Sequence, residues 1–321
     1  MDDRAGSRDS VRLCGSGPLV TIGLPVFNGE RHLGEALESL LNQDYRNIEV
    51  LVSDNCSTDG TREICLQAAR RDERVRYLRL DEAVPTLENF NRLPPLGRGT
   101  YFMWAAHDDV RERGFISSLV GVLEAEPKAV LAFSRFDNID ETGRTVRRYA
   151  EDWRKVFSEP VFRQFWKFAL ADEGATQKAN HMYGVMRRAE LAAIGGMARC
   201  EVNYSGEDIV TLMRLLSRGR FVVVDEVLFH YRVRTRATRT NQPLFGYLSN
   251  RVRGAIPGHH SNLLTFLRRN HALHGGMRRT ILREAPLARH QKVILCLATR
   301  VKEVTVPVRA TFSSAFRELR G

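Results

Sequence analysis

The amino-acid sequence predicts an α/β fold built on a mostly parallel sheet, and two observations carry that prediction. In residues 20–136, short apolar runs rich in β-branched residues alternate with segments whose apolar residues recur at helical spacing. Such alternation is typical of parallel strands joined by right-handed helical crossovers. The 321 residues, 43% hydrophobic and 27% charged, suit one or two globular domains and exclude a mostly disordered or fibrous chain.

The first half of the chain supplies five strands and four helices. We expect buried strands at residues 20–27, 48–53, 75–80, 101–106 and 129–136. Helices are expected between them, at residues 30–43, 61–71, 86–92 and 113–124. Asn28-Gly29 ends the first strand, and Pro94-Pro95 stops the third helix because proline cannot continue it.

After about residue 140 the regular alternation ends. The pattern predicts an aromatic helix at 153–170, a strand at 182–186, a helix at 208–217 and a pair of strands at 221–225 and 227–233. Further helices are expected at 261–274, 277–284 and 289–304. We find no internal repeat and no long low-complexity linker.

The net charge of +11 is distributed unevenly along the chain. Residues 231–321 hold 18 Lys/Arg against 3 Asp/Glu, a net of +15, which leaves 31 basic and 35 acidic side chains, a net of −4, in residues 1–230. A basic C-terminal segment on a slightly acidic body predicts a polyanionic partner, either a membrane surface or nucleic acid.

Cysteine usage and the N-terminus indicate a cytoplasmic location. The five cysteines include no CxxC pair and no metal-ligand spacing, which is typical of reduced thiols. Residues 1–17 are polar and lack the apolar stretch of a signal peptide, so we expect them to be disordered. No stretch of the sequence is long and apolar enough to span a bilayer, which leaves a soluble or peripheral protein.

Polar side chains follow three of the expected strands, at the ends where open α/β sheets bind ligands. Asn28 and Glu30 follow the first strand, Asp54 follows the second, and Asp108-Asp109 follow the fourth. Two adjacent carboxylates suit a hard divalent cation that bridges the oxygens of a diphosphate. Taken alone, Asp54 also fits an ordinary turn residue, the Asp pair a helix N-cap, and His107 a satisfied polar residue instead of a metal ligand.

Three motifs of other nucleotide and ester chemistries are missing from the sequence. The chain has no G-x-G-x-x-G dinucleotide fingerprint, no G-x-x-x-x-G-K-[ST] loop and no G-x-S-x-G elbow. A nicotinamide oxidoreductase and an α/β-hydrolase are therefore disfavoured.

Three segments in order resemble the family 2 glycosyltransferases: VTIGLPVFNGERHLGEALESLLNQDYRNIEVLVSDNCSTDGT, then GRGTYFMWAAHDDV, then YSGEDIVTLMRLLSRG. The resemblance covers roughly Val20 to Arg239. It implies a GT-A fold, in which a Rossmann-like sheet is flanked by helices. The expected organisation is a disordered N-terminus (1–17), a GT-A domain (18–239) with a nucleotide-binding half (18–140) and an acceptor half (141–239), and a basic, mainly helical C-terminal segment (240–321).

The resemblance assigns roles to the residues that match the family's motifs. Asp54 matches the acid that binds the donor's base, Asp109 the acid that binds the divalent metal (Mn²⁺ or Mg²⁺), and Asp208 the general base. The metal site would include Asp108 and His107, and the catalytic step would have Glu207 beside Asp208. Residues expected to contact the nucleotide-sugar are Pro25, Val26, Phe27, Asn28, Glu30, Asp54, Asn89, Asp108 and Arg234.

The chain departs from the family pattern at two positions. Ala106 stands where many members have the first Asp of D-x-D-D, so metal binding would rest on Asp109 with help from Asp108 or His107. Arg234 stands where the family's Y-R-x-H segment has a histidine, with His230 as a poorer substitute. An arginine there would contact the diphosphate directly as a fixed cation.

The implied activity is inverting, metal-dependent transfer of a sugar from a nucleotide-diphosphate-sugar to an acceptor hydroxyl. A metal held by Asp109 would stabilise charge on the leaving diphosphate, and a carboxylate must take the acceptor's proton during attack. Asp208, at a helix start whose dipole favours the anion, is expected to be ionised at neutral pH. Without the motif context, Glu207-Asp208 would be interpreted as simple N-terminal helix decoration.

The acceptor and the role of the basic tail stay open at this stage. We expect a lipid-linked glycan or another hydroxyl in cell-surface glycan, glycolipid or polysaccharide synthesis, with a small natural product as the alternative. The tail either lies on an anionic membrane at the inner face or packs on the catalytic domain with a solvated arginine face. Nucleic-acid binding would explain the tail's charge but not the acids at three strand ends, so it is disfavoured.

Overall fold

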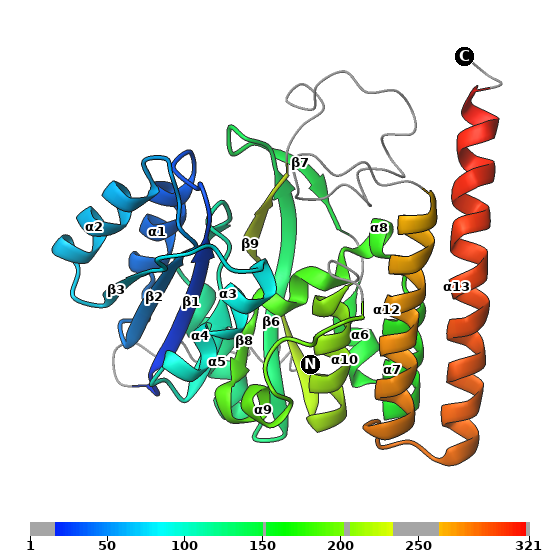
Figure 1. The fold of residues 1–321 in the computed structure, drawn as a ribbon. Coiled ribbons are helices and arrows are strands. Elements are labelled where there is room, and N and C mark those ends of the chain that lie inside the picture. The colour runs from blue at the N-terminus through cyan, green and yellow to red at the C-terminus, as the bar shows by residue number, and fades with distance from the viewer. Residues whose placement is uncertain (1–16, 150–151, 202–205, 234–262, 319–321) are drawn as a thin grey trace, which may run out of the picture.

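The computed structural model describes residues 17–149, 152–201, 206–233 and 263–318 (Figure 1). The predicted disordered N-terminus, except for Gly17, lies outside them. The strands are β1 (Val20–Val26), β2 (Ile48–Asp54), β3 (Val75–Arg79), β4 (Tyr101–Trp104), β5 (Val110–Arg111), β6 (Ala129–Ile139), β7 (Thr145–Arg148), β8 (Val185–Arg187) and β9 (Arg220–Arg232). In this part of the chain they form one sheet in the order β3-β2-β1-β4-β8-β6-β9-β5, with β7 paired to β6.

The N-terminal half of the sheet is parallel, as the sequence predicts. β1 pairs in parallel with β2 and β4, and β2 pairs in parallel with β3. Helices follow these strands at α1 (Leu33–Leu41), α2 (Thr61–Arg71), α3 (Thr86–Asn91), α4 (Leu93–Leu96) and α5 (Phe115–Ala125). Because the crossovers share one sense, the carboxyl ends of β1, β2 and β4 reach the same edge of the sheet.

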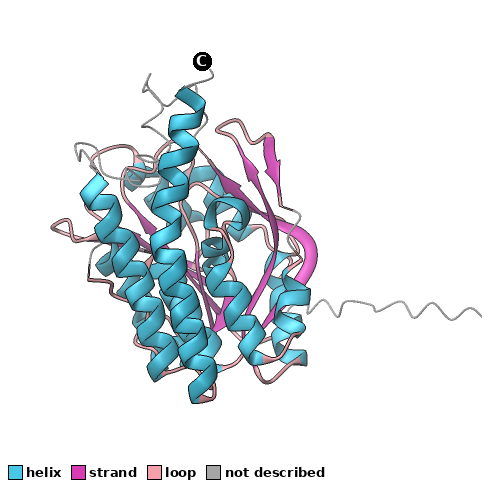
Figure 2. Cartoon of the chain, turned by 90° about the vertical axis from the view of Figure 1, so that its right-hand side faces the viewer, coloured by secondary structure: helices cyan, strands magenta, loops and turns pink. Residues whose placement is uncertain are grey.

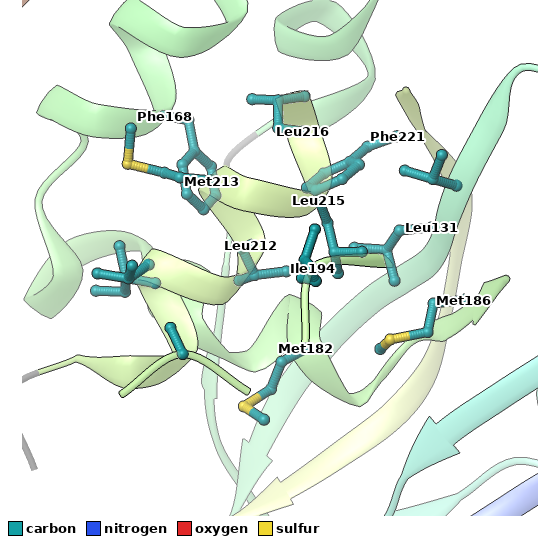
Figure 3. Packing of buried hydrophobic residues seen from close by; sticks show 14 of the residues in the cluster. Leu131, Phe168, Met182, Met186, Ile194, Leu212, Met213, Leu215, Leu216 and Phe221 are labelled. Carbon is teal, nitrogen blue, oxygen red and sulfur yellow. The ribbon is translucent and has the colours of Figure 1, made fainter. Parts of the chain in front are cut away.

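The sheet separates two hydrophobic cores. Side chains alternate between faces along a strand, so in β4 Tyr101 and Met103 join one core while Phe102 and Trp104 join the other. The first core lies under α1 and α5. The second is built with residues of α10 (Glu207–Arg218), such as Leu212 and Leu216, against Leu131 and Phe221 of the sheet (Figure 3).

The second half of the chain is less regular than the sequence pattern suggests. The expected helix at 153–170 is two helices, α6 (Trp153–Ser158) and α7 (Val161–Leu170), because Pro160 interrupts the backbone ladder. They are followed by α8 (Glu173–Thr176), the 3₁₀ helix η1 (Lys178–Tyr183) and α9 (Arg188–Ala193). The expected strand at 182–186 begins only at Val185, and this strand, β8, runs antiparallel between β4 and β6.

The expected pair of strands at 221–225 and 227–233 is wrong. β9 is one strand of 13 residues, and its pairing with β6 shifts register around Ser134–Phe136. The extra residues of β9 are therefore absorbed as a bulge and not as a turn. β5 and β7 were not expected, since β5 has two residues and the side chains of β7 are all exposed.

The basic C-terminal segment contributes two long helices, α12 (Leu263–Arg283) and α13 (Arg289–Glu318), which lie side by side at the surface (Figure 2). The predicted break between 274 and 277 is wrong. Gly275-Gly276 continue α12, and a Cβ at Gly276 would lie 2.9 Å from a methyl group of Val210, so glycine permits close packing on α10. Met277, Ile281 and Leu295 are buried in the second core, so these helices pack on the domain.

No helix in the part of the chain that the structure describes is long and apolar enough to cross a bilayer.

Candidate active site

The loops after β1 and β2 are joined by hydrogen bonds that use two of the predicted donor-binding side chains. Asn28 Oδ1 accepts from Thr58 N at 2.9 Å, and Glu30 Oε2 accepts from Gly60 N at 2.7 Å. Asn28 has a left-handed backbone (φ 50°), which turns the chain sharply at the end of the strand. Pro25 and Val26 are buried within β1, whereas the Phe27 ring is 53% exposed at the rim. Among the residues of this loop that are expected to contact the nucleotide-sugar, Phe27 thus exposes an apolar ring to solvent.

Asp54 lies fully buried at the end of β2 and both of its oxygens have partners. Oδ1 accepts from Ser57 N at 2.8 Å, and Oδ2 accepts from Tyr77 Oη at 2.5 Å and from Arg79 Nη1 at 2.8 Å. Burial opposes ionisation, but the hydrogen bonds from Ser57 and Tyr77 and the charge of Arg79 hold the pKa of Asp54 below its usual value. A nucleobase would have to displace one of these donors to contact Asp54 directly.

Asn89 of α3 makes two hydrogen bonds to Ser53 near the end of β2. Its amide donates to the carbonyl oxygen of Ser53 at 3.0 Å and its oxygen accepts from the Ser53 hydroxyl at 2.5 Å. It is 3% exposed. The structure therefore gives Asn89 contacts that fix the end of β2 next to Asp54.

Asp109, like Asp54, is fully buried. It lies between β4 and β5, has no exposed surface, and accepts from Arg232 N at 2.9 Å through Oδ1. Its other oxygen, Oδ2, has no hydrogen-bond partner within the described residues. Burial, followed by the charge of Asp108, raises the pKa of Asp109 to about 7, against the pull of Arg111.

Arg232 of β9 holds Asp108 and Asp109, which together form an acidic turn between β4 and β5, in place. Its Nε donates to the carbonyl oxygen of Asp108 at 2.7 Å and its Nη2 to Glu35 Oε2 at 2.6 Å, and its side chain is 3% exposed. Arg111 is a second buried cation nearby, 4.9 Å from the Phe229 ring, and burial lowers its pKa to about 10. Both arginines offset part of the negative charge of the turn.

Asp208 comes from the other half of the domain. Gly206 (φ 91°) caps α10, and Asp208 Oδ1 accepts from Ile209 N at 2.7 Å. Burial raises the pKa of Asp208 to about 6, with a smaller contribution from Glu207 in the same turn. The carboxyl is still ionised at pH 7, as predicted, but its pKa moves opposite to the direction that the helix dipole alone would give.

Two tyrosines are influenced both by the Asp108-Asp109 pair and by Asp208. Tyr183, at the end of η1, has its pKa raised by burial and by the charges of Asp109, Asp108 and Asp208, along with that of Tyr231. The pKa of Tyr231 on β9 is raised for the same reasons. Carboxylates 100 residues apart in the sequence thus act on the same two phenols, so the structure brings Asp108, Asp109 and Asp208 into one electrostatic cluster.

The remaining predicted residues lie apart from this cluster or outside the described residues. The His107 ring packs against Gly29, where a Cβ would be 2.8 Å from its Cδ2 atom. His230 faces away and bonds Asp137 at 2.5 Å and Glu112 at 2.9 Å. Arg234 lies outside the described residues.

Sequence reasoning missed four residues that shape the site: Arg79, Arg111, Tyr183 and Arg232. Arg232 is the arginine of the quoted Y-R-x-H segment, so its motif was a usable signal. Arg79, Arg111 and Tyr183 carried none, because each matters through a partner on another strand or helix.

The donor set fits a divalent cation whose other ligands come from a substrate. No group of three or more His, Cys, Asp or Glu side chains that could hold a metal occurs in the described parts of the chain. Mg²⁺ is usually held by one or two carboxylates plus substrate phosphates, and not by an all-protein cage. The partnerless Oδ2 of Asp109, with Asp108 beside it, matches that arrangement.

Comparison with known proteins places the chain among glycosyltransferases. A family model described as Glycosyl transferase family 2 matches residues 21–185. Glycosyltransferase GlyA of Streptococcus pneumoniae is 24% identical over 217 residues, which cover 67% of this chain and 30% of GlyA. The chain spans between about a fifth and two fifths of the length of the curated relatives that it matches.

Solved structures show the same fold. S. aureus TarS 1–349 in complex with UDP-GlcNAc gives a TM-score of 0.61 at 18% identity, covering 86% of this chain and 70% of the TarS 1–349 chain. The mannosyltransferase PcManGT from Pyrobaculum calidifontis, in complex with GDP-Man and Mn²⁺, gives a TM-score of 0.57 at 18% identity. The match covers 93% of this chain and 75% of the PcManGT chain. The predicted GT-A fold with C-terminal helices is confirmed.

We predict that Asp54→Asn destabilises the protein, with a distinct pH dependence. The folded pKa of Asp54 is lowered, so its contribution to stability is present above the ordinary value of 3.8 and is lost as the pH falls through the folded value. The substitution should lower the free energy of unfolding in urea by about 1–3 kcal/mol at pH 7. The deficit should shrink below pH 3.8. Asp81→Asn, on an exposed neighbouring loop, is the control, and a deficit independent of pH would contradict the assignment.

Proposed function

Because the chain belongs to glycosyl transferase family 2, we propose that it transfers a sugar from a nucleotide-diphosphate-sugar to an acceptor hydroxyl, with inversion at the anomeric carbon. The observation that carries the proposal is that Asp109, which is fully buried, and the partly buried Asp108 and Asp208 all act on the same two phenols, those of Tyr183 and Tyr231. Such a cluster is costly to bury and fits a site that receives a cation and an acceptor proton.

The donor lies, in this proposal, along the edge formed by the ends of β1, β2 and β4. The exposed Phe27 ring and the half-exposed guanidinium of Arg79 border the first two strand ends. TarS and PcManGT have been solved with UDP-GlcNAc and with GDP-Man and Mn²⁺, respectively, which supports a donor of this class. Asp54 acts by fixing Arg79 and the loop at residues 57–61.

Asp109 and Asp108 would hold a divalent cation, Mn²⁺ or Mg²⁺. When bound, it neutralises the charge that develops on the leaving diphosphate. Arg232 keeps Asp108 and Asp109 in position: its main-chain N–H donates to Asp109 Oδ1, and its Nε donates to the carbonyl oxygen of Asp108. Burial raises the pKa of Asp109 to about 7 although Arg111 and Arg232 lower it, and its Oδ2 has no hydrogen-bond partner within the described residues, so a bound cation would stabilise the carboxylate.

Asp208 is the proposed general base. Its pKa of about 6 leaves it ionised at pH 7 yet basic enough to accept a proton from the attacking hydroxyl. Attack in line with the departing diphosphate, with no covalent enzyme intermediate, inverts the configuration. His230, which is already bonded to Asp137 and Glu112, is not required for this step.

The acceptor in this proposal is a lipid-linked glycan or another hydroxyl used in glycan synthesis, and α13 offers a surface for a membrane. Along its outer face, Val293, Leu297, Val301 and Val304 recur at helical spacing, and with Ile294 they are 48–64% exposed. The exposed Arg289 and Arg300 flank this stripe. Between residues 289 and 305 the one acidic side chain, Glu303, is buried and bonded to His271, Arg278 and Arg300.

That combination suits an anionic bilayer. Apolar side chains enter the interface, and each basic residue near the surface contributes about 1 kcal/mol. A nucleic acid would match the charge but leaves the apolar stripe in water, so the membrane is the partner we propose.

Nucleotide release should depend on both the metal and Asp109. With UDP-, GDP- and dTDP-sugars, we expect at least one donor to give release that rises with Mn²⁺ and stops with EDTA. Asp109→Asn should lower that rate by about 10²–10³-fold, since it removes the carboxylate that would hold the cation against the leaving diphosphate. Glu63→Gln on α2 should match wild type. Equal rates in wild type and Asp109→Asn would contradict the role of Asp109.

Asp208→Asn should separate donor binding from transfer. The affinity for UDP or GDP should stay unchanged, while transfer or hydrolysis falls by about 10²–10⁴-fold because the proton has no acceptor. In wild type, kcat/KM should fall as the pH drops below about 6, where the carboxyl becomes protonated. Glu63→Gln on α2 is again the control, and retained transfer in Asp208→Asn would remove Asp208 as the base.

Membrane binding should require the stripe on α13. The chain should sediment with vesicles containing phosphatidylglycerol at low salt but not with neutral phosphatidylcholine vesicles. The double substitution Leu297→Glu and Val301→Glu should weaken binding about tenfold or more, since it removes apolar burial and adds repulsion. Val146→Glu, at an exposed valine of β7, is the control. No binding to anionic vesicles at low salt would exclude this surface as a membrane site.

A further inference from the structure

A cavity of about 220 Å³ lies beside the bulge in the pairing of β6 and β9. Its lining residues do not belong to the loops that follow β1, β2 and β4. Its lining is partly aromatic, with Phe133, Phe136, Tyr149, Trp153 and His181, and partly polar, with Ser134, Arg135, Asp152, Arg154 and Asp225. A cavity of about 150 Å³ takes a benzene ring, so this volume admits a six-membered ring that carries hydroxyl groups.

His181 is the unusual member of the lining. It is 1% exposed, and neither Nδ1 nor Nε2 has a hydrogen-bond partner within the described residues. Its ring stacks on Phe133, with centroids 3.9 Å apart, and meets Trp153 edge-on at 4.9 Å. Buried polar atoms are nearly always paired, so two unpaired ring nitrogens on a residue that lines the cavity indicate a missing partner.

The protonation state of the His181 imidazole determines which hydrogen-bonding groups the missing partner must carry. Burial, together with the charge of Lys178, lowers the pKa of His181 to about 3, so the ring is neutral at physiological pH. A neutral imidazole presents one N–H donor and one acceptor nitrogen. Hydroxyl groups donate and accept, and therefore match both nitrogens.

The charged side chains at the cavity are balanced. Asp225 bonds Arg154 at 2.8 Å and lies 3.7 Å from Arg135, and Arg154 lies 3.7 Å from Asp152. Two arginines and two aspartates carry no net charge, so the entrance favours a neutral ligand with several polar groups over an anion or a cation. Aromatic walls suit the polarised C–H face of a sugar ring, because the face of an aromatic ring is negative.

The cavity is joined to the reaction centre by η1. His181 and Tyr183 belong to this one 3₁₀ helix, and Tyr183 feels the charges of Asp108, Asp109 and Asp208. A ligand in the cavity therefore lies on the acceptor half of the domain, within one short helix of the catalytic carboxylates.

We infer that this cavity is an acceptor subsite, in which His181 and the aromatic walls bind a neutral sugar ring of a glycan whose other end carries the reacting hydroxyl. The inference rests on the proposed function and narrows its acceptor to a saccharide of at least two units. A small natural product without a sugar would leave the nitrogens of His181 unpaired.

The test is binding of neutral tetrasaccharides without nucleotide. The full chain is titrated calorimetrically with chitotetraose, mannotetraose, cellotetraose and maltotetraose, and Trp153 emission is followed in parallel. At least one should bind saturably and change the emission. His181→Phe should weaken that binding at least about tenfold, as expected when hydrogen bonds to a buried site are lost. Its Tm should equal or exceed that of wild type, because a phenyl ring needs no partner.

His274→Phe, at a second buried histidine on α12, should leave tetrasaccharide binding unchanged. Asp225→Ala, at an exposed position, provides a second variant that does not disturb the core and should also weaken binding. No saturable binding of any tetrasaccharide, or unchanged affinity in both His181→Phe and Asp225→Ala, would overturn the inference. UDP and GDP binding, measured separately, tests the proposed function: nucleotide binding without tetrasaccharide binding overturns the subsite alone.

Discussion

The negative charge of three carboxylates, those of Asp108, Asp109 and Asp208, constrains the structure around the site. Asp109 among them has no exposed surface. Asp109 is fully buried with one oxygen unpaired, and Asp108 and Asp208 act on the same two tyrosines. Isolated buried carboxylates are strongly disfavoured, so the fold must supply partial compensation and leave a defined deficit. Burial is the largest cause of the raised pKa of both Asp109 and Asp208.

Much of the second half of the fold serves this cluster. β9 carries Arg232 and Tyr231 to the acidic turn, and the antiparallel insertion of β8 lets η1 bring Tyr183 there. α10 presents Asp208 from the second core, and α12 packs closely on α10 through Gly276 and on Gly206 through Leu273. The C-terminal helices therefore brace α10 on one side and expose an apolar stripe on the other.

The sequence predicted the features that local pattern controls. The five strands of the first half, the start of α10 and the carboxylates at strand ends follow from periodicity and from motifs in order. It could not show that residues 220–232 form one bulged strand, because a bulge is fixed by the neighbouring β6. Nor could it show that Gly275-Gly276 continue a helix, since the reason is contact with Val210 on another helix. Tyr183 and His181 escaped notice for the same reason: their roles come from neighbours distant in the chain.

In the proposed mechanism, a divalent cation together with a nucleotide diphosphate completes the cluster of Asp108, Asp109 and Asp208. Calorimetric titration of UDP, GDP, UMP and GMP, with and without Mn²⁺, measures this most directly. Mn²⁺ should tighten binding of a diphosphate at least about tenfold and leave the monophosphates nearly unaffected, because only the diphosphate shares the cation with Asp109. Equal diphosphate affinity with and without Mn²⁺ would contradict the claim.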